Sequence, residues 1–151
     1  ESAAVKLKIV EQDNLEKGKR KVLNLGHSIG HAIEAYSQKN DPDPLLHGEA
    51  VAIGLICECF ISMRMFGMPE PDLEKLANLI SWHFPHYRLK HGAAEELLAL
   101  MSHDKKNPAH SQLNFSLIRK IGDPVFDQFP GEKLIRESLH FYMNLEVGFF
   151  V

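Results

Sequence analysis

Apolar residues in the first half of the chain recur mostly at helical spacing. From Gly18 to Tyr36 they return at close to the 3.6-residue period of an amphipathic helix. Gly48 to Phe66 is almost entirely apolar or small, which is typical of a buried central helix, and Gly67 follows it as a C-terminal stop. The polar, proline-rich run Ser37 to Pro44 must form the loop between the two. The pattern therefore predicts two consecutive helices joined by a loop.

Shorter periodic segments flank this pair. Ala3 to Glu11 fits either a short helix or a strand, and we favour a helix. Pro71 to Phe84, Gly92 to His103 and Gly131 to Asn144 each have helical periodicity. Gln112 to Ile121 alternates enough to form a short strand or hairpin. The expected fold is mainly α, a multi-helix domain with at most a short β-hairpin.

Composition narrows the class of protein. The chain has 151 residues, of which 44% are hydrophobic and 25% charged, as expected for one soluble domain. Its apolar runs are shorter than the ~20 residues that span a bilayer, and no secretory signal opens the chain. The net charge is -3 with dispersed basic residues, so no nucleic-acid footprint is present. We expect a cytoplasmic protein that binds neither membrane nor nucleic acid.

Two pairs of small residues lie within the predicted helices. Gly26 and Gly30, four residues apart, indicate close approach of another backbone or of a ligand. Cys57 and Cys59 lie two apart in an apolar stretch, where a helix would point them to different sides. We interpret them as reduced core residues, with a two-cysteine metal site as the alternative.

The densest group of chemically active residues surrounds three histidines. His27 and His31 share one face of a helix at i and i+4, so two imidazoles can converge on one cation or ligand. His47 opens the next helix and could supply a third. The alternative is that these imidazoles pack or hydrogen-bond within a core. Zinc suits imidazole and carboxylate ligands, but the spacing does not say which two of the three histidines would bind it.

Charged residues lie on both sides of the histidine segment. Lys6, Glu16 and Arg20 precede it, and Lys105 and Lys106 follow far downstream. Such residues usually form a solvated face. If they turn inwards, they become clamps for phosphate and carboxylate groups.

Four motifs together resemble the C-terminal domain of 3-dehydroquinate synthases. They are GKRKVLNLGHSIGHAIE (Gly18–Glu34), LLHGEAVAIGL (Leu45–Leu55), DKKN (Asp104–Asn107) and IRKIGDP (Ile118–Pro124). The resemblance extends from about Lys6 to the end of the chain. Ser28 departs from the usual threonine but keeps the hydroxyl, and the loop after Tyr36 is a few residues longer than usual.

The resemblance implies a metal- and NAD-dependent lyase of the shikimate pathway for aromatic amino acids. Such enzymes convert 3-deoxy-D-arabino-heptulosonate 7-phosphate to 3-dehydroquinate and phosphate. NAD oxidises the substrate, phosphate is eliminated, the hydride returns and an aldol reaction closes the ring. A divalent ion, zinc or cobalt, would act as a Lewis acid.

The family pattern also implies roles for individual residues of this chain. His27 and His47 match metal ligands, the third being a glutamate outside this chain, and His31 matches a substrate-binding residue that assists proton transfer. Glu34 and Glu49 would orient the imidazoles. The remaining matches contact the carboxylate, hydroxyl or phosphate groups of the substrate: Lys6, Glu16, Arg20, Asn24, and one of Lys105 and Lys106, with Lys105 favoured.

Residues 1–151 would then form the C-terminal helical domain only. The chain begins at Glu1 without methionine, which indicates a piece of a longer protein. The NAD-binding N-terminal domain would lie outside it, so we expect no cofactor-binding residues here, no activity from this piece alone, and a homodimer for the parent. The alternatives are another sugar-phosphate cyclase, a glycerol-dehydrogenase-like metal enzyme, or a non-catalytic helical metal-binding module.

Overall fold

A computed structural model describes residues 2–13, 18–103 and 113–145 of the chain. Its elements, in chain order, are α1 (Ser2–Gln12), the 3₁₀ helix η1 (Lys19–Asn24), α2 (His27–Asn40), α3 (His47–Phe66), α4 (Glu70–His83), α5 (Ala93–His103), β1 (Phe115–Lys120), β2 (Asp123–Gln128) and α6 (Glu132–Met143). The expected mainly helical fold with one short hairpin is confirmed. Among the described helices, none is both long and apolar enough to cross a membrane.

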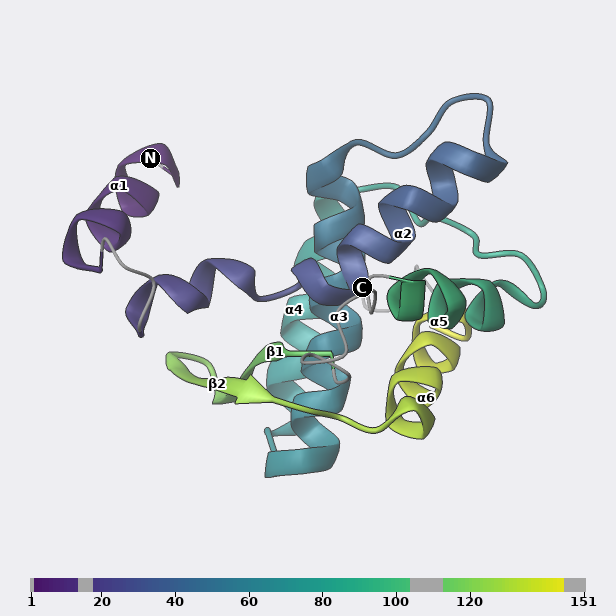
Figure 1. Ribbon diagram of the computed structural model, residues 1–151. Coiled ribbons are helices and arrows are strands. Elements are labelled where there is room, and N and C mark those ends of the chain that lie inside the picture. The colour runs from purple at the N-terminus through teal and green to yellow at the C-terminus, as the bar shows by residue number, and fades with distance from the viewer. Residues whose placement is uncertain (1, 14–17, 104–112, 146–151) are drawn as a thin grey trace.

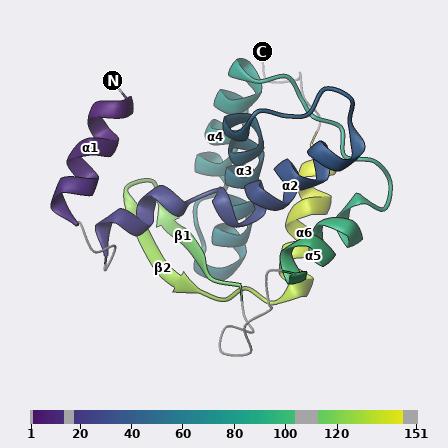
Figure 2. The same ribbon diagram turned by 45° about the horizontal axis from the view of Figure 1, so that its top comes forward.

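The long helix α3 lies at the centre of the molecule. Helices α2, α4 and α6 and strand β1 all pack against it, and α5 bridges α2 and α6 (Figure 1). Helix α1 stands at the edge of the molecule and contacts η1, as both views show (Figure 2). The two ends of α3 are thus fixed by different neighbours, α2 near its start and the hairpin further along.

The predicted helix from Gly18 to Tyr36 is wrong as a single element. The chain forms η1 up to Asn24, and Gly26 then adopts a left-handed conformation with φ 82° before α2 starts. Residues with a Cβ rarely adopt this conformation, so the glycine permits a sharp change of direction inside an apparently continuous periodic pattern. The loop predicted to begin at Ser37 begins only after Asn40, because α2 continues to that residue.

The hairpin lies against α3 through its first strand. Strands β1 and β2 pair antiparallel, with Lys120 opposite Asp123 and a turn at Gly122, which has φ 87°. Phe115 and Leu117 of β1 are fully buried in the core. The strand predicted within residues 112–121 is therefore confirmed, and β2 completes the hairpin.

Helices α2 and α3 cross at a contact between backbones. A Cβ built on Gly54 of α3 would lie 2.1 Å from the carbonyl oxygen of Gly26 and 2.6 Å from the nitrogen of Gly30. Both distances are far below van der Waals contact, so a side chain at position 54 cannot be accommodated. The close approach expected from the paired glycines is confirmed, and its partner is the backbone of α3.

A buried carboxyl group lies one turn beyond that crossing. Glu58 is 0% exposed, and its two oxygens accept hydrogen bonds from the backbone N–H groups of Gly26 (2.6 Å) and Ile29 (3.2 Å). These donors belong to the first turn of α2, where no backbone carbonyl satisfies them. Burial raises the pKa of Glu58 to about 8, although the hydrogen bonds to backbone N–H groups lower it.

The two cysteines of α3 are free and buried, as expected for core residues. Cys57 belongs to the main core cluster, and Cys59 packs with Met68 and Leu73 in a second, smaller one. Burial raises the pKa of both thiols, that of Cys59 to about 12. Both thiols are therefore protonated at neutral pH, and among the described residues neither belongs to a group that could hold a metal ion.

Replacing Gly54 with alanine should separate α2 from α3. Because the added methyl group meets the α2 backbone, we expect the free energy of unfolding to fall by at least about 2 kcal/mol. Gly48→Ala on the same helix is the matched control, since nothing lies within 4 Å of its Cβ position. It should raise the stability by up to about 1 kcal/mol. Urea unfolding measures both, and equal midpoints for the two variants would contradict the crossing geometry.

The raised pKa of Glu58 makes stability depend on pH. Between the ordinary value of 4.5 and about 8 the folded chain binds the proton more tightly than the unfolded chain. The free energy of unfolding therefore falls as the pH rises through this window, by up to about 1.4 kcal/mol per pH unit from this group. Glu58→Gln should remove this contribution. Thermal unfolding of both proteins from pH 5 to 8 tests it, and parallel pH profiles would refute the assignment.

Candidate metal and substrate site

Three imidazoles converge where α2 and α3 begin. His27 is the first residue of α2, His31 lies one turn further on, and His47 is the first residue of α3. One ring nitrogen from each lies within 4.8 Å of those from the other two, and the ring centroids are 5.4 to 5.6 Å apart. Among the described residues this trio forms the one group that gathers enough ligand atoms to hold a metal ion.

The glycine crossing explains this convergence. Gly26 ends η1 and lets α2 begin at His27, while Gly54 allows α3 to lie directly against the start of α2. The first turns of the two helices are thereby brought together, although His31 and His47 are separated by a loop in sequence. The site is positioned by backbone contact between two helices, which is more rigid than a loop.

Hydrogen bonds fix the tautomer of two rings. His27 Nδ1 lies 3.2 Å from the carbonyl oxygen of Leu25, and His47 Nδ1 lies 3.0 Å from Oε2 of Glu34. Both partners are acceptors when Glu34 is ionised, so each Nδ1 carries the proton and donates. The Nε2 atoms are left with free lone pairs, and this arrangement suits a metal ion.

The electrostatic environment also favours neutral imidazole at His27. Burial lowers the pKa of His27, and the neighbouring histidines and Lys6 act in the same direction, against the hydrogen bond to Leu25. A neutral ring is the form that binds a cation. The donor atoms of the trio and the lowered pKa of His27 therefore fit a divalent ion such as zinc.

The two glutamates near the histidines have different roles. Glu34 accepts the hydrogen bond from His47, as expected for a residue that orients an imidazole. The expectation for Glu49 is wrong. Its Oε2 accepts the backbone N–H of Leu46 at 2.7 Å, so it caps the first turn of α3. A carboxylate two residues after the start of a helix reaches back to the N-cap more easily than to a side chain at the start.

A cavity of about 460 Å³ opens beside the imidazoles. The residues that line it come from η1, α2 and the hairpin region: Lys21, Asn24, His27, Ser28, His31, Asn114, Ser116 and Asp127. It lies within the size range of small-molecule sites. Three residues expected to contact a metal or substrate, Asn24, His27 and His31, thus line one cavity.

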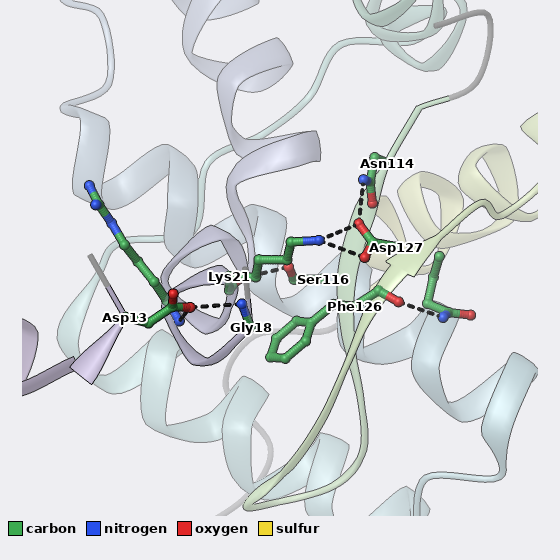
Figure 3. Close-up of polar contacts among 9 residues, drawn as sticks. Asp13, Gly18, Lys21, Asn114, Ser116, Phe126 and Asp127 are labelled. Carbon is green, nitrogen blue, oxygen red and sulfur yellow. Dashed lines mark hydrogen bonds and ion pairs between the residues drawn. The ribbon is translucent and has the colours of Figure 1, made fainter. Parts of the chain in front are cut away.

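The cavity lining also contains residues that sequence reasoning missed. Lys21 Nζ donates to both oxygens of Asp127, at 2.8 and 2.6 Å, and Asn114 donates to the same carboxylate at 2.8 Å (Figure 3). Ser116 Oγ donates to the carbonyl oxygen of Lys21 at 2.7 Å. Lys21 lies within the histidine motif, but Asp127 and Asn114 come from about a hundred residues away, and nothing local in sequence connects them.

The other expected site residues are only partly placed. Lys6 is exposed on α1, and its positive charge contributes to the lowered pKa of His27. Arg20 lies on η1, and its backbone N–H donates to Oδ2 of Asp13 at 3.1 Å. Neither of these lines the cavity. Glu16, Lys105 and Lys106 fall outside the described residues.

Several curated relatives of this chain carry the name 3-dehydroquinate synthase. A 3-dehydroquinate synthase of Parabacteroides distasonis is 40% identical over 142 residues, covering 94% of this chain and 40% of that protein. The 3-dehydroquinate synthase of Aeropyrum pernix is 35% identical over 135 residues, covering 89% of this chain and 36% of that protein. The chain thus spans about two fifths of the length of the relatives it matches.

Solved structures of related cyclases share the fold. A 2-deoxy-scyllo-inosose synthase complexed with carbaglucose-6-phosphate, NAD⁺ and Co²⁺ superposes with a TM-score of 0.72 at 26% identity, over 91% of this chain and 38% of that one. ValA, a 2-epi-5-epi-valiolone synthase from Streptomyces hygroscopicus with NAD⁺ and Zn²⁺ bound, superposes with a TM-score of 0.68 at 22% identity. That match covers 90% of this chain and 36% of ValA and indicates the fold alone.

A match to a family model establishes which family this chain belongs to. The model described as 3-dehydroquinate synthase C-terminal matches residues 1–107, which include all three histidines and both glycines of the crossing on α2. The chain belongs to the 3-dehydroquinate synthase family and corresponds to its C-terminal domain.

Proposed function

We propose that this chain is the metal- and substrate-binding part of a 3-dehydroquinate synthase. The reaction would convert 3-deoxy-D-arabino-heptulosonate 7-phosphate to 3-dehydroquinate and phosphate, as a lyase of the shikimate pathway in the cytoplasm. The observation that carries the proposal is the convergence of three imidazoles within 4.8 Å beside a cavity of about 460 Å³. The names of the relatives supply the product, 3-dehydroquinate.

His27 and His47 are proposed as ligands of a zinc or cobalt ion. Both rings present Nε2 while Nδ1 is held by an acceptor, and the structural relatives carry Co²⁺ or Zn²⁺. When bound, the ion would supply Lewis-acid stabilisation of negative charge on a substrate oxygen. Two imidazoles fall short of the three protein ligands usual for catalytic zinc, so a glutamate from another domain would complete the set.

His31 is proposed to contact the substrate and move protons. It is exposed, lines the cavity and lies beside both proposed ligands. An imidazole in this position can accept a proton from the substrate and return it. Asn24 would hold a hydroxyl or phosphate oxygen from the cavity wall. The further proposed substrate contacts are Lys6, Glu16, Arg20, Lys105 and Lys106.

NAD would bind to a separate N-terminal domain. The relatives are about two and a half times as long as this chain. The solved structures with NAD⁺ bound also extend well beyond the part that superposes on it. We therefore propose that this piece is inactive by itself and that the complete protein is a homodimer. Calorimetric zinc titration of the 151-residue chain and of the complete protein tests the division, because tight binding should require the complete protein.

A second candidate is another sugar-phosphate cyclase activity. The superposition with the inosose synthase supports it, since that fold is shared at 26% identity. Phosphate release from the heptulosonate phosphate and from glucose 6-phosphate, with NAD and zinc present, distinguishes the two. Turnover of glucose 6-phosphate alone would refute the dehydroquinate assignment.

Removing either proposed ligand should abolish most metal affinity. We expect His27→Ala and His47→Ala to weaken zinc binding by more than about a hundred-fold, which exceeds the usual cost of losing an outer partner. His83→Ala is the control, because His83 is exposed on α4 and bonds the carbonyl of Leu79. Arg20→Ala should weaken substrate binding and leave zinc in place. Competition with a chromogenic chelator measures the affinities, and full zinc content in His27→Ala would refute the ligand assignment.

Removing Glu34 should weaken metal binding, whereas removing Glu49 should lower only the stability of the fold. Glu34→Ala removes the acceptor that orients His47, so we expect zinc affinity to fall roughly ten- to a hundred-fold. Glu49→Ala removes a helix cap instead and should lower stability by about 1 kcal/mol with little change in zinc affinity. The same chelator competition and urea unfolding measure the two variants. Equal zinc affinities would contradict the separation of roles.

A further inference from the structure

The ion pair between Lys21 and Asp127 joins two separate parts of the chain at the cavity. Lys21 lies on η1 and Asp127 on β2, and both oxygens of the Asp127 carboxylate accept hydrogen bonds from the Lys21 ammonium group. Asn114, just before β1, donates to one of these oxygens as well. Two donors from different segments therefore hold one carboxylate, which leaves little freedom for its orientation (Figure 3).

The backbone at Asp127 departs from a regular strand. Its φ is 56°, and it is the one residue other than glycine with a positive φ in the described part of the chain. Residues held in this conformation are often found at functional sites, where the surrounding structure imposes it. Because side chains alternate along a strand, this change re-aims the carboxylate relative to its neighbours on β2.

A second ion pair on the hairpin lacks these features. Arg119 and Asp123, on the same hairpin, form an exposed i,i+4 pair at 3.2 Å that does not line the cavity. Lys21, in contrast, is 26% exposed and shares the cavity with His27 and His31. An exposed pair of the first kind contributes little to stability, and a fixed pair facing a binding cavity is suited to recognition.

We propose that Lys21 and Asp127 are specificity-determining residues that bind the hydroxyl-bearing part of the sugar-acid phosphate in the cavity that they share with His27 and His31. The proposal rests on the proposed function of the same cavity. It adds to the site a pair that joins η1 to the hairpin.

The chemistry of the pair fits a polyhydroxylated ligand. The Asp127 side chain is 51% exposed, so its carboxylate retains lone pairs that accept hydrogen bonds from ligand hydroxyl groups. Lys21 donates to that carboxylate and keeps a remaining N–H for a ligand oxygen. A ligand without hydroxyl groups would desolvate the remaining lone pairs of the carboxylate without donating hydrogen bonds to them, and this penalty gives discrimination.

Asp127→Asn is the sharpest test of the pair. Asparagine tolerates the left-handed backbone, so the variant removes charge and acceptor capacity without adding strain. In the complete zinc-loaded protein with NAD, we expect KM for the heptulosonate phosphate to rise roughly ten- to a hundred-fold, with kcat changed less than about three-fold. Lys21→Met should raise KM in the same way, and the double variant should add little more, because the two residues act together.

Asp123→Asn is the matched control from the same strand. It removes a carboxylate that also pairs with a cation but lies off the cavity, so KM should stay at the wild-type value. Zinc affinity should be unchanged in all of these variants, since none contacts an imidazole. A KM for Asp127→Asn within two-fold of wild type, or equal to that of Asp123→Asn, would overturn the proposal.

Failure of the proposed function gives a different result. A wild-type protein that binds zinc but does not turn over the heptulosonate phosphate would refute the proposed function. The role of Lys21 and Asp127 would then be tested by ligand binding in place of turnover. Calorimetric titration with glucose 6-phosphate then decides. A higher Kd for Asp127→Asn than for Asp123→Asn would support the pair as a binding site for hydroxylated phosphates. Equal Kd values would overturn the proposal.

Discussion

The contact between the backbones of α2 and α3 is the constraint on which the rest of this domain depends. Gly26, Gly30 and Gly54 let the two helices touch without side chains between them. Glu58 then satisfies the N–H groups at the start of α2, which the crossing has removed from water. Close packing and hydrogen bonding act on the same turn of helix, so His27 has little freedom to shift relative to His47.

The histidine site combines this rigid support with a donor set that suits a cation. The carbonyl of Leu25 and the carboxylate of Glu34 each hold one Nδ1, and burial keeps His27 neutral. The ligand atoms are therefore oriented before any ion arrives, which reduces the ordering cost of binding. A metal centre built this way needs few residues of its own, because the helix starts do the positioning.

Sequence reasoning recovered what local patterns encode and missed what the fold brings together. The spacing of His27 and His31 predicts their shared face, and the paired glycines predict a close approach. The break at Gly26 was missed because the apolar period continues through it. Glu49 was misassigned because its proximity to His47 in sequence says nothing of its reach to the backbone. The pairing of Lys21 with Asp127 depends on how the hairpin docks, which no local pattern contains.

The cavity is lined by η1, α2 and the hairpin region, and its histidines and its hairpin residues obey separate constraints. Its histidines sit on the glycine crossing, where even a methyl group is excluded. Its other wall comes from the hairpin, which is anchored to α3 by the buried Phe115 and Leu117 while the exposed Asn114 and Asp127 face the cavity. Substitutions at these exposed positions need not disturb the core. The same scaffold can therefore carry different side chains on the hairpin side, while the glycines hold the histidine side to one arrangement.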